Sequence, residues 1–138
     1  TTEPENHDLM TRLRAEKIAR RADGLPELGV EGCADADLLI VGFGGTYGHL
    51  HSAMDELNKA GKKAALAHFR FINPLPKNTA AVLRKYKKIV VAEQNLGQLA
   101  GYLRMNIEGI HLYQFNQVKG QPFVVQELVD AFTKIMEE

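Results

Sequence analysis

From Asp37 onward, short runs of apolar residues alternate with segments in which apolar residues recur every three or four positions. Three of the runs are continuous, as in parallel strands covered on both faces, and they span residues 38–41, 64–69 and 89–92. In a fourth segment Ile110, Leu112 and Phe115 alternate with polar residues, which indicates a strand nearer an edge. This alternation predicts an α/β fold with a largely parallel sheet and right-handed crossovers.

Four helices are predicted between and after these strands. The clearest one is capped by Thr46 and ends at Gly61. Its apolar residues follow helical spacing and are Leu50, Ala53, Met54 and Leu57. The other helices are predicted over 76–86 with Val82, Leu83 and Tyr86 inward, over 97–105 with Leu99, Ala100 and Leu103 inward, and from Pro122 with Val125, Leu128, Val129, Phe132 and Ile135 inward.

Residues 1–36 are predicted to be a connecting helix and linker from an upstream domain, with residues 37–138 forming the α/β domain. Asn6 or Asp8 would cap the helix, which would end near Ala22. Residues 30–36 show no periodicity and are predicted to be linker. The chain opens without an initiator Met, as expected of a processed chain or a piece of a longer one.

Composition excludes several classes of function. A chain of 138 residues is the length of one domain. Its 17 Lys and Arg balance its 17 Asp and Glu, so no net charge favours binding to a nucleic acid or an anionic membrane. The only cysteine, Cys33, can form neither an intramolecular disulfide nor a four-thiolate metal centre. The sequence has no membrane-length apolar stretch and no signal peptide, so a cytoplasmic location is expected.

Four loops should share one edge of the sheet. In parallel sheets the loops after the strands emerge together, and ligands or partners bind there. Here these loops are 42–48, 70–76, 93–98 and 116–121. The candidate residues of a ligand or interface rim are Gly44, Gly45, Thr46, Tyr47, Gly48, Arg70, Asn73, Glu93, Asn95, Gly97 and Gln98. No catalytic residue is predicted, because no nucleophile lies in register with a base and Glu93 has no partner acid.

The glycine-rich loop allows two interpretations, tight-turn packing or the binding of an anion at a helix N-terminus. Its spacing Gly42-x-Gly44-Gly45-x-x-Gly48 is not that of a dinucleotide-binding fingerprint, and no acid follows about twenty residues later. No metal site is predicted either. His49 and His51 lie two positions apart and would point to different faces of a helix.

Four sequence motifs in order resemble the carboxy-terminal domain of the alpha subunit of 2-oxoacid:ferredoxin oxidoreductases, and most closely the 2-oxoglutarate enzymes. These motifs are LIVGFGGTYG at 39–48, HFRFINPLP at 68–76, VAEQNLGQL at 91–99 and GQPF at 120–123. The resemblance implies a transketolase C-terminal-like, Rossmann-like domain, which is a three-layer α/β/α sandwich. Its five-stranded mixed sheet would have one antiparallel strand, so a fifth strand is expected from residues 28–30 or from another edge of the chain.

The resemblance also implies a function. The intact enzyme oxidatively decarboxylates a 2-oxoacid to an acyl-CoA, with coenzyme A as substrate, and reduces ferredoxin. It uses thiamine diphosphate, Mg²⁺ and iron–sulfur clusters, which other domains and the beta subunit bind, so no cofactor is expected in this domain. The domain would be a non-catalytic interaction module, inactive alone, whose partners are the upstream domains, the beta subunit and, through the complex, ferredoxin. The alternative is a module that binds a small anion or nucleotide, such as coenzyme A, with loop 44–48.

Overall fold

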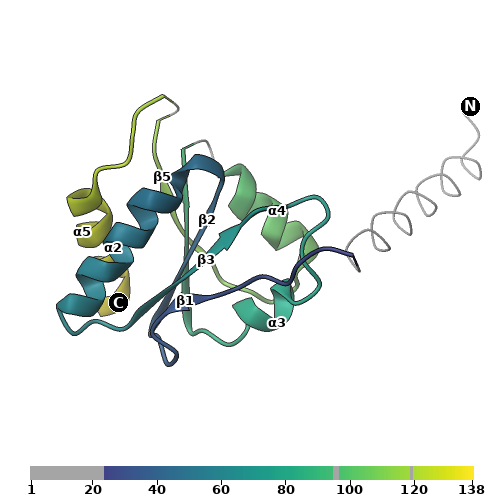
Figure 1. Cartoon of the computed structure of the whole chain (residues 1–138), viewed down its shortest axis with the longest axis horizontal. Helices are drawn as coiled ribbons and strands as arrows, with labels where there is room; N and C mark the ends of the chain where they lie inside the picture. The colour runs from purple at the N-terminus through teal and green to yellow at the C-terminus, as the bar shows by residue number, and fades with distance from the viewer. Residues whose placement is uncertain (1–23, 95–96, 119) are drawn as a thin grey trace, which may run out of the picture.

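The structure is a computed structural model, and it describes residues 24–94, 97–118 and 120–138 (Figure 1). The predicted helix over residues 8–22 lies outside the described residues. The strands are β1 (Glu31–Gly32), β2 (Leu38–Phe43), β3 (Ala64–Phe69), β4 (Lys88–Glu93) and β5 (Tyr113–Asn116). The helices are the 3-10 helix η1 (Gly44–Thr46), α2 (Tyr47–Lys59), α3 (Thr79–Leu83), α4 (Gln98–Asn106) and α5 (Val125–Glu137). None of these helices is long and apolar enough to cross a membrane.

All five strands form one mixed sheet in the order β1-β3-β2-β4-β5. Strands β3, β2, β4 and β5 are mutually parallel, and β1 pairs antiparallel with β3. Strand β2 lies at the centre, where Leu38 pairs with Ala64 on one side and with Lys88 on the other. The predicted α/β class, the mostly parallel sheet and the single antiparallel strand are therefore confirmed.

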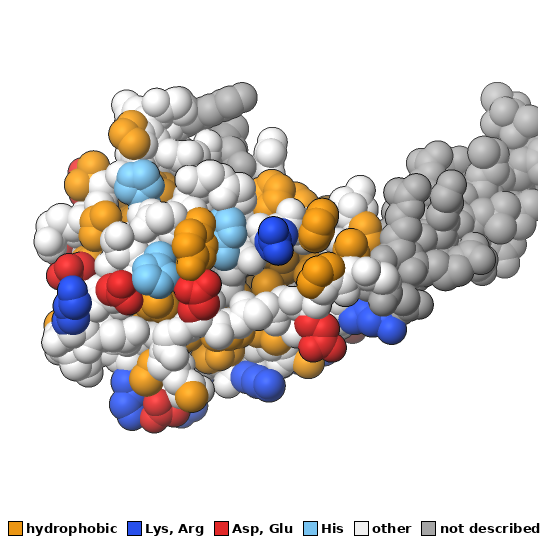
Figure 2. Space-filling view, viewed as in Figure 1, with side chains coloured by type: hydrophobic (Ala, Val, Ile, Leu, Met, Phe, Trp, Pro, Cys, Tyr) orange, Lys and Arg blue, Asp and Glu red, His pale blue; other side chains and the backbone are white. Residues whose placement is uncertain are grey.

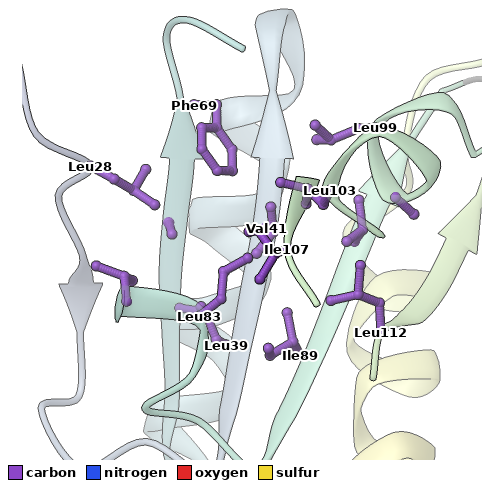
Figure 3. Close-up of a cluster of buried hydrophobic side chains, with 14 of the residues drawn as sticks. Leu28, Leu39, Val41, Phe69, Leu83, Ile89, Leu99, Leu103, Ile107 and Leu112 are labelled. Carbon is purple, nitrogen blue, oxygen red and sulfur yellow. The ribbon is translucent and has the colours of Figure 1, made fainter. Parts of the chain in front are cut away.

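Helices cover both faces of the sheet and make the three layers of an α/β/α sandwich (Figure 1). Helices α2 and α5 pack on one face, where Leu38 and Ile40 of β2 point. Helices α3 and α4 pack on the other face, with Leu39 and Val41 (Figure 3). Successive strand residues thus point to opposite hydrophobic layers, which explains why the central strands are continuously apolar.

Strand β1 corrects the prediction that residues 30–36 are linker. Glu31 and Gly32 pair with Leu66 and Ala65, and the strand begins one residue after the stretch proposed as a source for it. The pairing needs a glycine, because Gly32 adopts φ 100° and a Cβ there would lie 2.8 Å from the backbone carbonyl oxygen of Ala64 and 2.6 Å from Sδ of Met54. A strand of two residues is too short to show periodicity, so the sequence pattern did not reveal it.

Two predicted helix boundaries are also wrong. Helix α3 begins at Thr79 rather than at Pro76, because Thr79 bonds back to the Pro76 carbonyl in a turn. Helix α5 begins at Val125 rather than at Pro122, since Val124 is extended and Phe123 is buried against Phe115. The predicted strand over 110–115 is shifted to Tyr113–Asn116, although it does lie at an edge.

The helix residues predicted to face inward pack against the sheet. All four apolar residues predicted for α2 are buried, as are Leu99, Ala100 and Leu103 in α4 and Leu128 and Phe132 in α5. Burial of such side chains stabilises a fold by about 1.5–3 kcal/mol each. Packing therefore positions the helices, whereas turns and loop contacts decide where they begin.

Candidate functional site

The carboxyl ends of β2, β3, β4 and β5 lie at one edge of the sheet, because these strands are parallel. The four loops predicted to form a rim therefore share that edge, and we call it the carboxyl-edge rim (Figure 1). Its loops are residues 42–48, 70–76, 93–98 and 116–121, of which Asn95, Leu96 and Lys119 lie outside the described residues. The candidate residue Asn95 is therefore not among the residues whose positions are described.

Two of the four glycines in the glycine-rich loop have a structural reason to be glycine, Gly42 because of close packing and Gly44 because of its backbone conformation. A Cβ at Gly42 would overlap the Leu50 side chain and lie 3.3 Å from Cδ2 of His68, so only glycine lets β2 approach α2 there. Gly44 adopts φ 76°, which favours glycine. Gly45 and Gly48 have open space at their Cβ positions. The Thr46 hydroxyl donates to the Phe43 carbonyl at 3.3 Å and makes no side-chain cap of the predicted kind.

Glu93 is buried and caps helix α4. Its two carboxylate oxygens accept the backbone N–H groups of Leu99 at 2.7 Å and Ala100 at 3.0 Å. A carboxylate at this position satisfies unpaired N–H groups and interacts favourably with the helix dipole. Glu93 thus acts within the domain, and these two helix donors are already occupied by an anion.

Hydrogen bonds join the third and fourth loops of the carboxyl-edge rim. The Gln117 N–H donates to the Glu93 carbonyl at 2.8 Å, and Nε2 of Gln94 donates to the Gln121 carbonyl at 2.7 Å. Nε2 of Gln117 donates to the Pro122 carbonyl at 3.3 Å. These amides hold two loops in a fixed relation, so this part of the rim is preorganised.

A pocket of about 350 Å³ opens where the first three loops meet. Phe43, Ile72, Leu99 and Tyr102 supply its large apolar and aromatic side chains, and we call it the rim pocket. The remaining lining residues are Gly45, Thr46, Ala92, Glu93, Gln94 and Gln98. Among the described residues, Glu93 is the one charged member of the lining, and it is the group that caps α4. The pocket is therefore an apolar recess with amides at its border.

Apolar side chains also stand exposed along this rim. Phe43 is 41% exposed and Phe71 46%, although both are large aromatic residues. Val118 in the fourth loop is 68% exposed, and Val124, which follows this loop, is 48% exposed. Among the described residues of the four loops, only Arg70 and Glu93 are charged, whereas charged residues make up 25% of the chain. Protein interfaces show the same depletion of charge and enrichment in aromatic residues.

A separate polar cluster lies beside the rim, between β1 and α2. The Tyr47 hydroxyl lies 2.7 Å from both carboxylate oxygens of Glu31, and Nε2 of His51 lies 3.4 Å from one of them. Figure 2 shows histidine side chains next to acidic ones on this face. The hydrogen bond to Glu31 raises the pKa of Tyr47, since ionisation would remove the donor. The cluster fastens β1 to the first turns of α2.

His68 lies under this cluster. Its ring meets that of Tyr47 edge to face with centroids 5.2 Å apart, and burial lowers its pKa from the ordinary value of 6.5. A backbone hydrogen bond with Gly44 and the charge of Glu31 act in the opposite direction. Within the part of the chain that the structure describes, its buried Nε2 has no hydrogen-bond partner.

The histidines do not converge on one point. His51 lies between Glu31 and Asp55, whereas the His49 ring packs edge to face against Phe123, with the ring centroids 6.4 Å apart. No group of three His, Cys, Asp or Glu side chains within residues 24–94, 97–118 and 120–138 could hold a metal ion.

The described residues among the predicted rim residues fall into four groups. Gly45, Thr46, Glu93 and Gln98 line the rim pocket. Tyr47 and Arg70 line a neighbouring recess with Glu31 and His68. Gly44, Gly48 and Asn73 are exposed outside both, and Gly97 is buried at the start of α4. Phe43 and Ile72, which form walls of the pocket, lie inside the predicted loops, but an apolar loop residue carries no sequence signal that distinguishes a pocket wall from an ordinary contact.

Comparison with known proteins gives consistent matches. Residues 36–128 match the family "Pyruvate:ferredoxin oxidoreductase core domain II". The chain is 43% identical over 129 residues to 2-oxoglutarate oxidoreductase subunit KorA of Mycobacterium tuberculosis, covering 91% of the chain and 19% of the relative. It is 28% identical over 142 residues to the 2-oxoacid:ferredoxin oxidoreductase subunit alpha of Saccharolobus solfataricus, covering 97% of the chain and 22% of the relative. The chain thus spans about a fifth of the length of these relatives.

A solved structure agrees with the sequence matches. It is the 2-oxoglutarate:ferredoxin oxidoreductase from Magnetococcus marinus with 2-oxoglutarate, coenzyme A and succinyl-CoA bound. The TM-score is 0.84 at 29% identity, covering 99% of this chain and 24% of that one. These findings confirm the resemblance drawn from the four loop motifs, and the chain belongs to the core domain II family of pyruvate:ferredoxin oxidoreductases.

Proposed function

We propose that this chain is a non-catalytic interaction domain of the alpha subunit of a 2-oxoacid:ferredoxin oxidoreductase that acts on 2-oxoglutarate. The observation that supports this most is the carboxyl-edge rim, which is poor in charge and exposes Phe43 and Phe71. The choice of 2-oxoglutarate follows the names of the Mycobacterium tuberculosis and Magnetococcus marinus relatives.

The partners of the domain would be the remaining alpha-subunit domains and the beta subunit, with ferredoxin reached through the assembled complex. The chain is about a fifth of the relatives' length, so most of the subunit is available to contact the rim. A cytoplasmic location is part of the same proposal. The complex would oxidatively decarboxylate its 2-oxoacid to an acyl-CoA and reduce ferredoxin.

The residues of this domain do not fit the cofactors that the family resemblance implies. Thiamine diphosphate is held through a divalent cation and oxygen ligands, and the described residues provide no ligand group of that kind. An iron–sulfur cluster needs several thiolates, whereas the chain has Cys33 alone. We therefore propose that other parts of the complex bind these cofactors, and no chemical step is assigned to this domain.

The anion-binding alternative receives no support from the geometry. Gly42, just before loop 44–48, allows the close approach of β2 to α2, and Gly44 adopts φ 76°, so these two glycines are explained without a bound anion. The Magnetococcus marinus structure holds coenzyme A, but the whole chain of that protein is about four times as long as this one.

A pair of charge substitutions tests the interaction role in the full complex. We expect Phe71→Asp to weaken assembly of the alpha and beta subunits, and to lower 2-oxoglutarate-dependent ferredoxin reduction in proportion. Met105→Asp is the control, because Met105 is 85% exposed near the opposite end of α4. Sedimentation of the complex gives the assembled fraction. Equal assembly together with equal ferredoxin reduction in both variants and the wild type would contradict an interface at the rim.

A further inference from the structure

The rim pocket has the shape and chemistry of a site for one apolar side chain. Phe43, Ile72, Leu99 and Tyr102 contribute from a strand end, a loop and helix α4, and together they enclose about 350 Å³. Figure 3 shows Leu99 at the start of α4, beside the sheet. This volume lies near the lower end of small-ligand pockets, which run from roughly 300 to 1,000 Å³. Recesses of this kind also anchor the residues that dominate protein interfaces.

The charges around the rim pocket disfavour an anionic occupant. The carboxylate of Glu93, the one charged group among the described lining residues, is turned onto the N–H groups of Leu99 and Ala100. A phosphate or carboxylate entering the pocket would meet that negative charge and find those donors taken. An uncharged group, bordered by the amides of Gln94 and Gln98, meets no such penalty.

The polypeptide enters the domain at this same edge. The backbone N–H and carbonyl of Leu28 bond to the Asn78 side chain at 2.7 and 2.9 Å, and Leu28 is buried. Pro26 and Leu28 line a small recess with Arg70 and Phe71 of the second loop. Figure 2 shows hydrophobic side chains gathered around a basic one in this region. The upstream part of the subunit is thus connected at the edge that carries the pocket.

We infer that the rim pocket receives a single aliphatic or aromatic side chain from the upstream part of the same alpha subunit. This inference rests on the proposed function and names the anchor of that interface. The surrounding exposed residues, Phe43 and Phe71 among them, would then be covered when the anchor is seated, which excludes water from the contact.

A substitution that fills the pocket tests the inference in the full-length alpha subunit. A specific protease site introduced before Gly24 allows the domain to be cut from the rest after folding. Gly45→Leu places a large side chain at the pocket, where a Cβ meets nothing within 4 Å. Gly101→Leu is the matched control, because Gly101 also has open space and does not line the pocket.

After cleavage, we expect the wild-type and Gly101→Leu domains to stay bound to the remainder on size-exclusion chromatography. The Gly45→Leu domain should dissociate, with an affinity lowered about tenfold or more. Release of the wild-type domain would overturn the inference, because the upstream part of the alpha subunit would then not hold the rim, whereas an interface with the beta subunit would leave the proposed function standing. Retention of wild-type and Gly45→Leu domains alike would overturn the pocket inference and leave the proposed function standing.

A crosslinking measurement does not depend on the folding of the Gly45→Leu variant. Tyr102→benzoylphenylalanine introduces a photoreactive group at the pocket wall of the intact subunit. We expect a crosslink to an apolar residue of the alpha subunit upstream of this domain. A crosslink to the beta subunit, or none outside the domain, would overturn the assignment.

Discussion

The carboxylate of Glu93 accepts the backbone N–H of Leu99 at 2.7 Å, so the last residue of β4 closes the first turn of α4. The second oxygen accepts from Ala100. In the sequence Glu93 stands in a polar loop and resembles an acid that could face a partner. In the structure it is buried and holds the wall of the rim pocket in place.

Replacing Glu93 should destabilise α4. In Glu93→Gln an amide N–H₂ would face one of the two helix N–H groups, leaving that donor unsatisfied. We expect the free energy of unfolding in urea to fall by about 1–3 kcal/mol. Glu108→Gln serves as the control because Glu108 is exposed, and it should change stability by less than about 0.5 kcal/mol. Equal values for the two variants would show that the cap contributes nothing.

Gly97 should tolerate a side chain less well than Gly61 does. Its φ of 84° disfavours other residues, and a Cβ there would lie 2.6 Å from Nε2 of Gln114. Gly61 has a similar φ of 80° but open space, so Gly61→Ala isolates the backbone cost, which is about 1 kcal/mol. We expect Gly97→Ala to lower the unfolding free energy by clearly more than that. Matching losses would mean that Gln114 moves aside freely.

The Asn78 side chain fixes the entry of the chain by bonding both backbone groups of Leu28. Asn78→Ala removes both bonds, and we expect a loss of about 1–2 kcal/mol with faster hydrogen exchange at the Leu28 amide. The control is Asn106→Ala, because the exposed Asn106 bonds only within its own helix in the described structure. Unchanged protection at Leu28 would contradict this role.

His68 should make stability depend on pH. Burial lowers its pKa below 6.5, and a proton on its buried Nε2 finds no acceptor among the described residues. The folded state therefore binds this proton less readily than the unfolded state. Stability should be full above about pH 6.5 and fall as the pH drops toward the lowered folded value.

The matched variant for this titration is His68→Gln, which keeps polarity and removes the ionisable group. Urea unfolding of both proteins between pH 8 and pH 5 isolates the contribution of this side chain. As the pH falls, the unfolding free energy of the wild type should decrease more than that of His68→Gln. Parallel curves would show that protonation of His68 does not oppose folding.

Much of the fold could be predicted from short patterns. Continuous runs such as 38–41 indicated strands covered on both sides, and both layers are indeed filled by helices. The helical spacing of Leu50, Ala53, Met54 and Leu57 identified the buried face of α2. These patterns predict correctly because burial constrains residues all along a helix or strand, so apolar residues recur with the period of that element.

The ends of elements and the two-residue strand β1 were missed for the opposite reason. Helix α5 begins after Phe123, whose ring packs against Phe115 of β5. Residue 32 of β1 has to be a glycine, because Met54 of α2 and the Ala64 carbonyl of β3 leave no room for a side chain. Each depends on a contact between residues far apart in the sequence. No local pattern contains such a contact.

The sequence by itself determined the α/β class, the parallel direction of the central strands and the four loops that share one edge of the sheet. Their motifs also indicated the family. Only the tertiary structure decided what those loops do, since it turned Glu93 inward onto α4 and grouped Phe43, Ile72 and Tyr102 around one pocket. Secondary structure follows from local periodicity, whereas the direction in which a loop side chain points depends on distant partners that compete for it.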